Sequence, residues 1–236
     1  MFEDKMRQPK SSATGAPDYI LRDLDESRLE DVLEVYSLLQ DAMGTDSVED
    51  LRSFRRTVSP LTDPRVLPRV VVASTECEVI GVMVGATLKN VGAGFIAYSA
   101  VQEASRRRGI YVRMRSRLLK RFTEDDGVEY VVSELDEGSW LFSKCIRDWN
   151  AVALPGHYEQ PEAQGLQAKT LRLVAQPVNN GITPGPFETL ALVRQIYEQI
   201  YRIKDAEGNE SYRRISASLT QSGPQYEIER NGTNRK

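Results

Sequence analysis

Histidine and cysteine are scarce in this chain of 236 residues. It has one histidine, His157, and two cysteines, Cys77 and Cys145, which match no disulfide or metal-ligand spacing. A metal site built from several histidines is therefore excluded, and we predict no metal cofactor. Two isolated thiols are typical of a reducing compartment, which favours a cytoplasmic protein.

Long apolar runs and an excess of one charge are also lacking. The longest apolar stretches, 70–73 and 79–84, fall far short of the ~20 residues that span a membrane. Residues 1–16 are polar and lack the apolar stretch of a secretory signal. The formal net charge of -3 gives no overall attraction to nucleic acid or to an acidic membrane. We therefore expect neither as a partner.

Composition and turn residues divide the chain into three parts. Residues 1–17 are rich in Lys, Arg, Ser and Pro and are predicted to be a disordered tail. Residues 18–176 carry the helix and strand patterns of one α/β domain. Residues 177–236 are predicted to contain a linker, a helix, a strand and a polar tail. The apolar stripe of that helix, with Tyr197 and Tyr201, must pack on the domain or form a homodimer interface.

The order of the predicted elements favours a mixed sheet flanked by helices. Apolar alternation predicts strands at 19–22, 70–74, 79–88, 95–101, 128–135, 171–175 and 212–219. Helical spacing predicts helices at 25–39, where Asp25 is the expected N-cap, and at 48–57, 109–122, 139–149 and 188–203.

The most informative segment is residues 95–122, FIAYSAVQEASRRRGIYVRMRSRLLKRF. A strand leads into a tight turn that contains Gly109, and a helix follows at once. The free N–H groups of a helix's first turn bind anions, and a glycine there lets a ligand approach the backbone closely. This junction predicts an anion-binding site.

Local charge supports that interpretation. Residues 104–123 hold eight basic side chains and no acid: Arg106, Arg107, Arg108, Arg113, Arg115, Arg117, Lys120 and Arg121. In an acidic chain, this reversal points to a polyanionic partner. A solvated basic helix face is the alternative. Binding of nucleic acid is a weaker alternative, because only two aromatic residues that could stack on bases, Tyr111 and Phe122, lie among these basic residues.

The turn Arg106-Arg107-Arg108-Gly109-Ile110-Tyr111 resembles the Gln/Arg-x-x-Gly-x-Gly/Ala motif of the GNAT superfamily, and Val101 fits the valine usual before it. The resemblance extends over about residues 18–175 and includes YILRDLDESRLEDVLEVYSLL, EVIGVMVGATL and VEYVVSELDE. It implies a mostly antiparallel mixed sheet and acetyl-CoA as co-substrate. The implied reaction is acetyl transfer to an amine, which attacks the thioester directly.

The resemblance also implies the cofactor-binding residues: Val101, Arg106, Arg107, Arg108, Gly109, Ile110 and Tyr111. A backbone N–H near Val101 would stabilise the tetrahedral oxyanion. Two positions depart from the family pattern. Tyr111 replaces a small residue, and the tyrosine that many members use as general acid falls near Ile146.

Two residues are candidates for proton transfer. Glu134 lies on a predicted buried strand, where a carboxylate is costly unless paired, and is a candidate general base. A salt-bridged or edge-exposed glutamate is the alternative. Tyr158 is the nearest tyrosine that can replace the missing acid, with loop packing as its alternative. Because that acid is missing, a non-catalytic acyl-CoA sensor or a decayed enzyme is the alternative function.

Residues 92–97, GAGFIA, match the dinucleotide-binding pattern G-x-G-x-x-A. That pattern must open a helix, whereas here it leads into a predicted strand, so we predict a hairpin turn instead. The acceptor amine has no readable motif. The acids of residues 23–34 hint at a cationic acceptor, and a solvated helix face explains them equally well.

Overall fold

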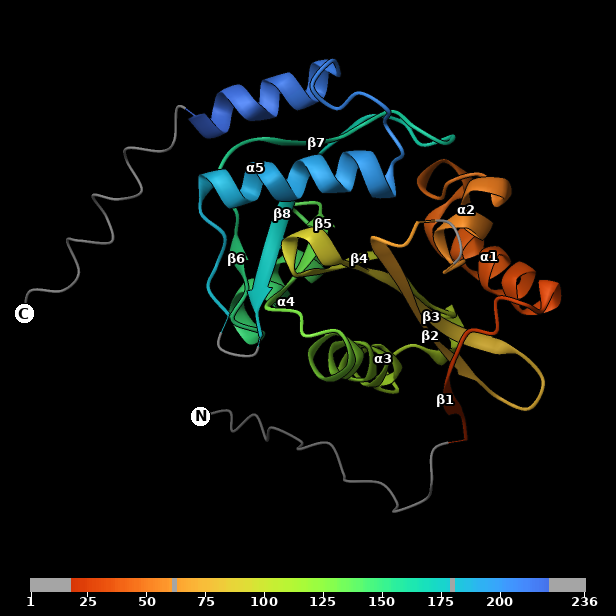
Figure 1. The fold of residues 1–236 in the computed structure, drawn as a ribbon. Helices are drawn as coiled ribbons and strands as arrows, with labels where there is room; N and C mark the ends of the chain where they lie inside the picture. The colour runs from red at the N-terminus through yellow and green to blue at the C-terminus, as the bar shows by residue number, and fades with distance from the viewer. Residues whose placement is uncertain (1–17, 61–62, 179–180, 221–236) are drawn as a thin grey trace, which may run out of the picture.

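A computed structural model describes residues 18–60, 63–178 and 181–220. Its centre is a sheet with the strand order β1-β2-β3-β4-β5-β8-β6, and β7 pairs with β8 (Figure 1). Among the described strands, only the β4–β5 pair is parallel. The strands are β1 Ile20–Asp23, β2 Val66–Ser74, β3 Val79–Leu88, β4 Ala93–Val101, β5 Tyr130–Leu135, β6 Val152–Ala153, β7 Tyr158–Gln160 and β8 Lys169–Pro177.

Helices cover both faces of the sheet because apolar residues alternate along the buried strands. In β2, Val70 and Val72 pack under α1 (Leu29–Met43) and α2 (Leu51–Thr57), whereas Val71 faces α3 (Ile110–Lys120). The helix α4 (Trp140–Asp148) packs on Leu135 and Val174 at the β5–β8 end of the sheet.

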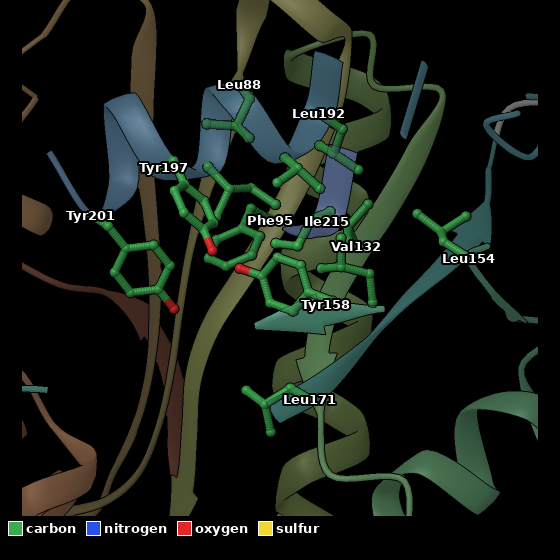
Figure 2. Close-up of a cluster of buried hydrophobic side chains, with 14 of the residues drawn as sticks. Leu88, Phe95, Val132, Leu154, Tyr158, Leu171, Leu192, Tyr197, Tyr201 and Ile215 are labelled. Atoms are coloured by element: carbon green, nitrogen blue, oxygen red, sulfur yellow. The ribbon is translucent and has the colours of Figure 1, made fainter. Parts of the chain in front are cut away.

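The C-terminal residues pack on the domain. The helix α5 (Pro186–Gln195) runs into a π-helical turn, Ile196–Ile200, and crosses the sheet above β8 and β5 (Figure 1). Tyr197 and Tyr201 enter one buried cluster with Phe95, Val132 and Tyr158 (Figure 2). The apolar stripe of this helix is therefore covered by the chain's own sheet.

The strand predicted at 212–219 is wrong, because residues 210–220 form a helix. The Asn209 side chain caps it by accepting from the Tyr212 N–H at 3.2 Å, and Arg214 pairs with Glu210 one turn away. Tyr212, Ile215 and Leu219, spaced at three and four residues, bury one face in the cluster. The C-terminal extension is thus two helices, not a helix and a strand.

The predicted fold class is confirmed: a mixed, mostly antiparallel sheet with helices on both faces. The short strands β6 and β7 were not predicted, and α1 starts at Leu29, where Arg28 rather than Asp25 is the N-cap. Residues 92–97 form the start of β4 after a tight turn, as the hairpin interpretation requires. The predicted tails, 1–17 and 221–236, lie outside the described residues. Within the described ranges, no helix is long and apolar enough to cross a membrane.

Candidate active site

The strands β4 and β5 part in the middle of the sheet. Their parallel pairing runs from Ala93 opposite Tyr130 to Ile96 opposite Ser133 and then stops, although both strands continue. A bulge leaves Ala97 without a partner in β3, since Val84 pairs with Tyr98 and Gly85 with Ile96. Beyond Ile96, the edge of β4 that faces β5 therefore has no strand paired with it, and a wedge-shaped gap separates the two strands.

A cavity of about 500 Å³ opens at this wedge. The β4 residues Ile96, Ala97, Tyr98 and Ser99 form one wall, and Ser133, Glu134 and Leu135 of β5 form another. The cavity is closed by the loop before α2, by the segment after β7 and by the C-terminal extension, which contribute Asp46, Glu49, Gln164, Leu166, Ile200 and Tyr201.

Glu134 points to the same sheet face as Tyr130 and Val132, beneath the C-terminal extension. Its carboxylate accepts hydrogen bonds from two tyrosine hydroxyls, Tyr158 at Oε1 and Tyr201 at Oε2, the latter at 2.5 Å. Burial raises the pKa of Glu134 to about 7, although the two hydroxyls favour its charged form. A carboxyl with that pKa exchanges protons readily near neutral pH.

The predicted pair Glu134 and Tyr158 is brought together, but not in the geometry that the prediction assumed. Tyr158 does not line the cavity; it lies behind Glu134, inside the aromatic cluster of Figure 2. Burial and the Glu134 charge raise the Tyr158 pKa well above its ordinary value. Tyr201, which sequence reasoning assigned to packing, is the tyrosine that both lines the cavity and touches Glu134.

The predicted phosphate cradle is an exposed turn at the start of α3. Gly109 is the N-cap in the left-handed region, with φ +76°, and no heavy atom lies within 4 Å of where its Cβ would be. No side chain of the described residues caps this end of the helix, so the first-turn N–H groups stay available to an anion. Ile110 is buried and anchors the helix start.

The basic residues near the turn divide into two groups. Further along α3, Arg117 and Arg121 pair with Asp23 of β1, so they bind the helix to the sheet edge. At the turn, Arg108 pairs with Asp18, and the Arg106 Nε donates to the Val101 carbonyl at 3.2 Å. Arg107, with φ +64°, makes no hydrogen bond or ion pair with any described residue. The charge available to a ligand therefore lies at the turn rather than along the helix.

Tyr111 fills the position that is small in the family motif. Its ring stacks on the ring of Trp149, with a centroid separation of 6.0 Å and an interplanar angle of 5°. The Arg115 guanidinium carbon lies 3.9 Å from the centroid of the same Trp149 ring. Burial raises the pKa of Tyr111 to about 12, although a hydrogen bond with Ser99 lowers it. The bulk is thus turned toward α4 and the cavity wall, away from the open space at Gly109.

Three other positions named in the sequence analysis do not line the cavity. Val101 ends β4 opposite Gly81, past the residues that line the cavity. His157 is exposed, with its Nε2 3.1 Å from a Glu159 oxygen. Ile146 is partly exposed on α4 and provides no proton donor. The candidate that sequence reasoning missed is Glu49. It lies in a short loop before α2, where no local motif marks it, and only its burial in the fold singles it out.

Glu49 gives a prediction for stability against pH. Burial raises its pKa from 4.5 to about 7. The folded state then holds this proton more tightly than the unfolded chain, so native stability falls as pH rises from 4.5 to about 7. Gln does not titrate, so the Glu49→Gln variant should not lose this stability. We therefore expect the unfolding free energy of the variant, minus that of the native protein, to increase by at most about 3 kcal/mol from pH 4.5 to about 7. Urea unfolding at a series of pH values measures the difference, and a difference independent of pH would contradict it.

Comparisons with known proteins agree with the fold. No protein-family model and no curated protein matches the sequence. Among solved structures, a protein assigned to the GNAT family of acetyltransferases from Bacteroides thetaiotaomicron aligns with 78% of this chain and 99% of its own, at TM-score 0.58 and 13% identity. The diaminobutyrate acetyltransferase of Paenibacillus lautus, solved with its substrate and coenzyme A, aligns with 70% of this chain and 98% of its own, at TM-score 0.53 and 16% identity.

The ribosomal-protein-S18-alanine N-acetyltransferase of Escherichia coli aligns with 70% of this chain and 96% of its own, at TM-score 0.51 and 12% identity. These likenesses show that the chain has the GNAT fold, as its motif predicts.

Proposed function

We propose that this protein transfers an acetyl group from acetyl-CoA to an amine. The observation that carries the proposal is one continuous arrangement. An uncapped helix start with an open glycine lies beside a wedge between β4 and β5, and this wedge leads into a cavity that holds a buried carboxylate. Two solved structures of the same fold support this reaction class. The Escherichia coli protein is named an N-acetyltransferase, and the Paenibacillus lautus protein is an acetyltransferase solved with an amine substrate and coenzyme A.

Each part of acetyl-CoA finds a matching part of the site. The diphosphate fits the first-turn N–H groups of α3 after Gly109, where the positive end of the helix dipole and Arg106, Arg107 and Arg108 favour anions. The amide groups of the pantetheine arm can pair with the β4 edge that β5 leaves open after Ile96. The thioester would then lie beside the cavity, with β4 N–H groups between Ala97 and Val101 as donors to the oxyanion.

The chemistry follows from Glu134. Its carboxylate takes a proton from the acceptor ammonium, and the free amine nitrogen attacks the thioester carbonyl carbon. The C–N bond forms and the C–S bond breaks, the second proton of the attacking nitrogen passes to the departing sulfur, and Glu134 releases the first proton to solvent. A base with a pKa of about 7 is half ionised at neutral pH, which suits this task. Tyr158 and Tyr201 orient the carboxylate through their hydrogen bonds.

The cradle is tested by calorimetry of acetyl-CoA binding to the native protein and to two variants of Gly109. Gly109→Ala and Gly109→Glu impose the same backbone strain at φ +76°, but only glutamate places a negative charge where the diphosphate lies. We expect Gly109→Glu to weaken binding at least about tenfold relative to Gly109→Ala. Circular dichroism confirms that both variants fold.

A screen for thiol release with a panel of amines completes the test. Acetyl-CoA binding together with thiol release supports the proposal. Binding without release from any amine would instead favour the acyl-CoA sensor. If the native protein binds no acyl-CoA, the proposed function is wrong.

A further inference from the structure

A second buried carboxylate, Glu49, lines the same cavity as Glu134. It comes from the loop before α2 and is only 3% exposed. Thr57 is hydrogen-bonded to the carboxylate, but the buried Oε2 atom accepts no hydrogen bond from any described residue. A buried acceptor without a donor is costly, and its usual explanation is a ligand, an ion or water.

The protein's own cation does not complete this site. Arg202 holds its Nη1 atom 3.7 Å from the Glu49 Oε2, beyond hydrogen-bond distance. One N–H of Nη1 donates to the Gln164 Oε1 at 2.9 Å, and one of Nη2 donates to the Thr57 hydroxyl at 3.2 Å. Arg202 therefore forms an ion pair that offsets part of the Glu49 charge, while the Oε2 atom still lacks a hydrogen-bond donor among the described residues.

Acidic residues outnumber basic ones in the cavity lining. Its lining holds the acids Asp46, Glu49, Glu134 and Asp136 and a single base, Lys169, which lies 4.0 Å from Asp136. An anionic acceptor would meet carboxylates without enough cations to offset them, whereas a cationic acceptor is attracted.

Tyr98 connects the two buried carboxylates. Its hydroxyl is hydrogen-bonded to the backbone of Glu49, and its ring lines the cavity wall on β4. Burial raises the Tyr98 pKa most, and the charges of Glu49 and Glu134 both raise it further. Glu49, Tyr98 and Glu134 all line the same cavity, so the two carboxylates border a single chamber rather than two separate pockets.

We propose that the acceptor is an amine with a second positive charge, a diamine or a similar dication. The inference rests on the proposed function, which assigns the reacting amine to Glu134. The distal ammonium donates to the Glu49 Oε2 and supplies the hydrogen bond that Arg202 does not. The aliphatic chain between the nitrogens lies along the cavity wall, which Ala97, Tyr98, Ser99 and Leu166 line.

The test compares matched amines on the native protein. Butane-1,4-diamine is set beside butylamine, and the homologous pairs one carbon shorter and one longer are included. Calorimetry at saturating coenzyme A measures binding without turnover, and thiol release from acetyl-CoA measures kcat/KM. We expect one diamine to exceed its monoamine at least about tenfold in both, since a buried charge pair contributes that much.

Two variants locate the effect. Glu49→Gln is expected to bring the ratio of diamine to monoamine close to one, whereas Glu30→Gln, an exposed acid on α1, leaves the ratio unchanged. Equal affinity of the native protein for diamine and monoamine overturns the inference, and so does the absence of binding by any diamine. If a diamine binds more tightly than its monoamine but no amine releases thiol from acetyl-CoA, the result supports the cation site at Glu49 and contradicts the proposed catalysis.

Discussion

Glu134→Gln is expected to lower kcat/KM for every accepted amine by about 10²- to 10⁴-fold, the usual contribution of a general base. The glutamine has the same size and keeps an acceptor for one of the two tyrosine hydroxyls, but it takes no proton from the amine. Acetyl-CoA binding should change little, because Glu134 lies on the cavity side of β5, away from the α3 turn. Steady-state thiol release beside calorimetry of acetyl-CoA separates the two effects.

The dependence of kcat/KM on pH is a second test of the role of Glu134. The Glu134 carboxylate acts as a base only when ionised, so kcat/KM should rise with pH up to about 7 and then level off. This rise should disappear in Glu134→Gln. A variant that keeps native activity and the native pH profile would remove Glu134 from the mechanism.

Phenylalanine variants of the two tyrosines distinguish their roles. If Tyr158 is the general acid, as its sequence position predicts, Tyr158→Phe lowers kcat strongly, and Tyr201→Phe does so less. If both only orient Glu134, each variant loses one hydrogen bond to the carboxylate and shifts the pH midpoint upward, because the hydroxyls lower the Glu134 pKa.

Tyr197→Ala is expected to destabilise the fold by about 3–5 kcal/mol, the range for removing a large buried aromatic side chain. Tyr197 is fully buried and makes edge contacts with Tyr158, Tyr201 and Tyr212 (Figure 2). Its hydroxyl donates to the Glu159 carbonyl at 2.5 Å, so truncation also removes a part-buried hydrogen bond. Urea unfolding followed by circular dichroism measures the loss.

The matched control lies on the adjoining helix. Phe187 of α5 is 87% exposed, so Phe187→Ala should stay within about 0.5 kcal/mol of the native protein. A cost below about 1 kcal/mol for Tyr197→Ala would mean that the C-terminal helices contribute little to the core, which the cluster does not support.

Much of the fold is predictable because its signals are local. The strand, turn and helix around Gly109 follow from a mostly apolar stretch, a glycine and a helical apolar stripe within one short segment. The helix at 210–220 was missed for the opposite reason. Ser and Thr between its apolar residues weaken the helical pattern, and its buried face is defined by β7 and α5, which are distant in sequence.

The site is less predictable than the fold. Glu134 was found because a carboxylate on a buried strand is unusual. Its partner Tyr201 is 67 positions away, in a segment whose spacing indicates only packing. Glu49 stands next to Asp50 in a polar loop, and nothing local separates a buried acid from the solvated N-cap beside it. Long-range packing decides both cases, and a single sequence does not encode it in a readable pattern.

Two neighbouring residues, Tyr201 and Arg202, reach Glu134 and Glu49 respectively, and Arg202 adopts φ +56° where the π-helical turn ends. The order of synthesis gives this arrangement a consequence. A chain that grows from its N-terminus completes the α3 turn well before this dipeptide exists, so the cradle can form on the nascent chain while the acceptor chamber still lacks a wall. A chain that stops before residue 201 would contain the α3 turn but lack both of these side chains, together with the helix at 210–220 that buries one face in the core cluster.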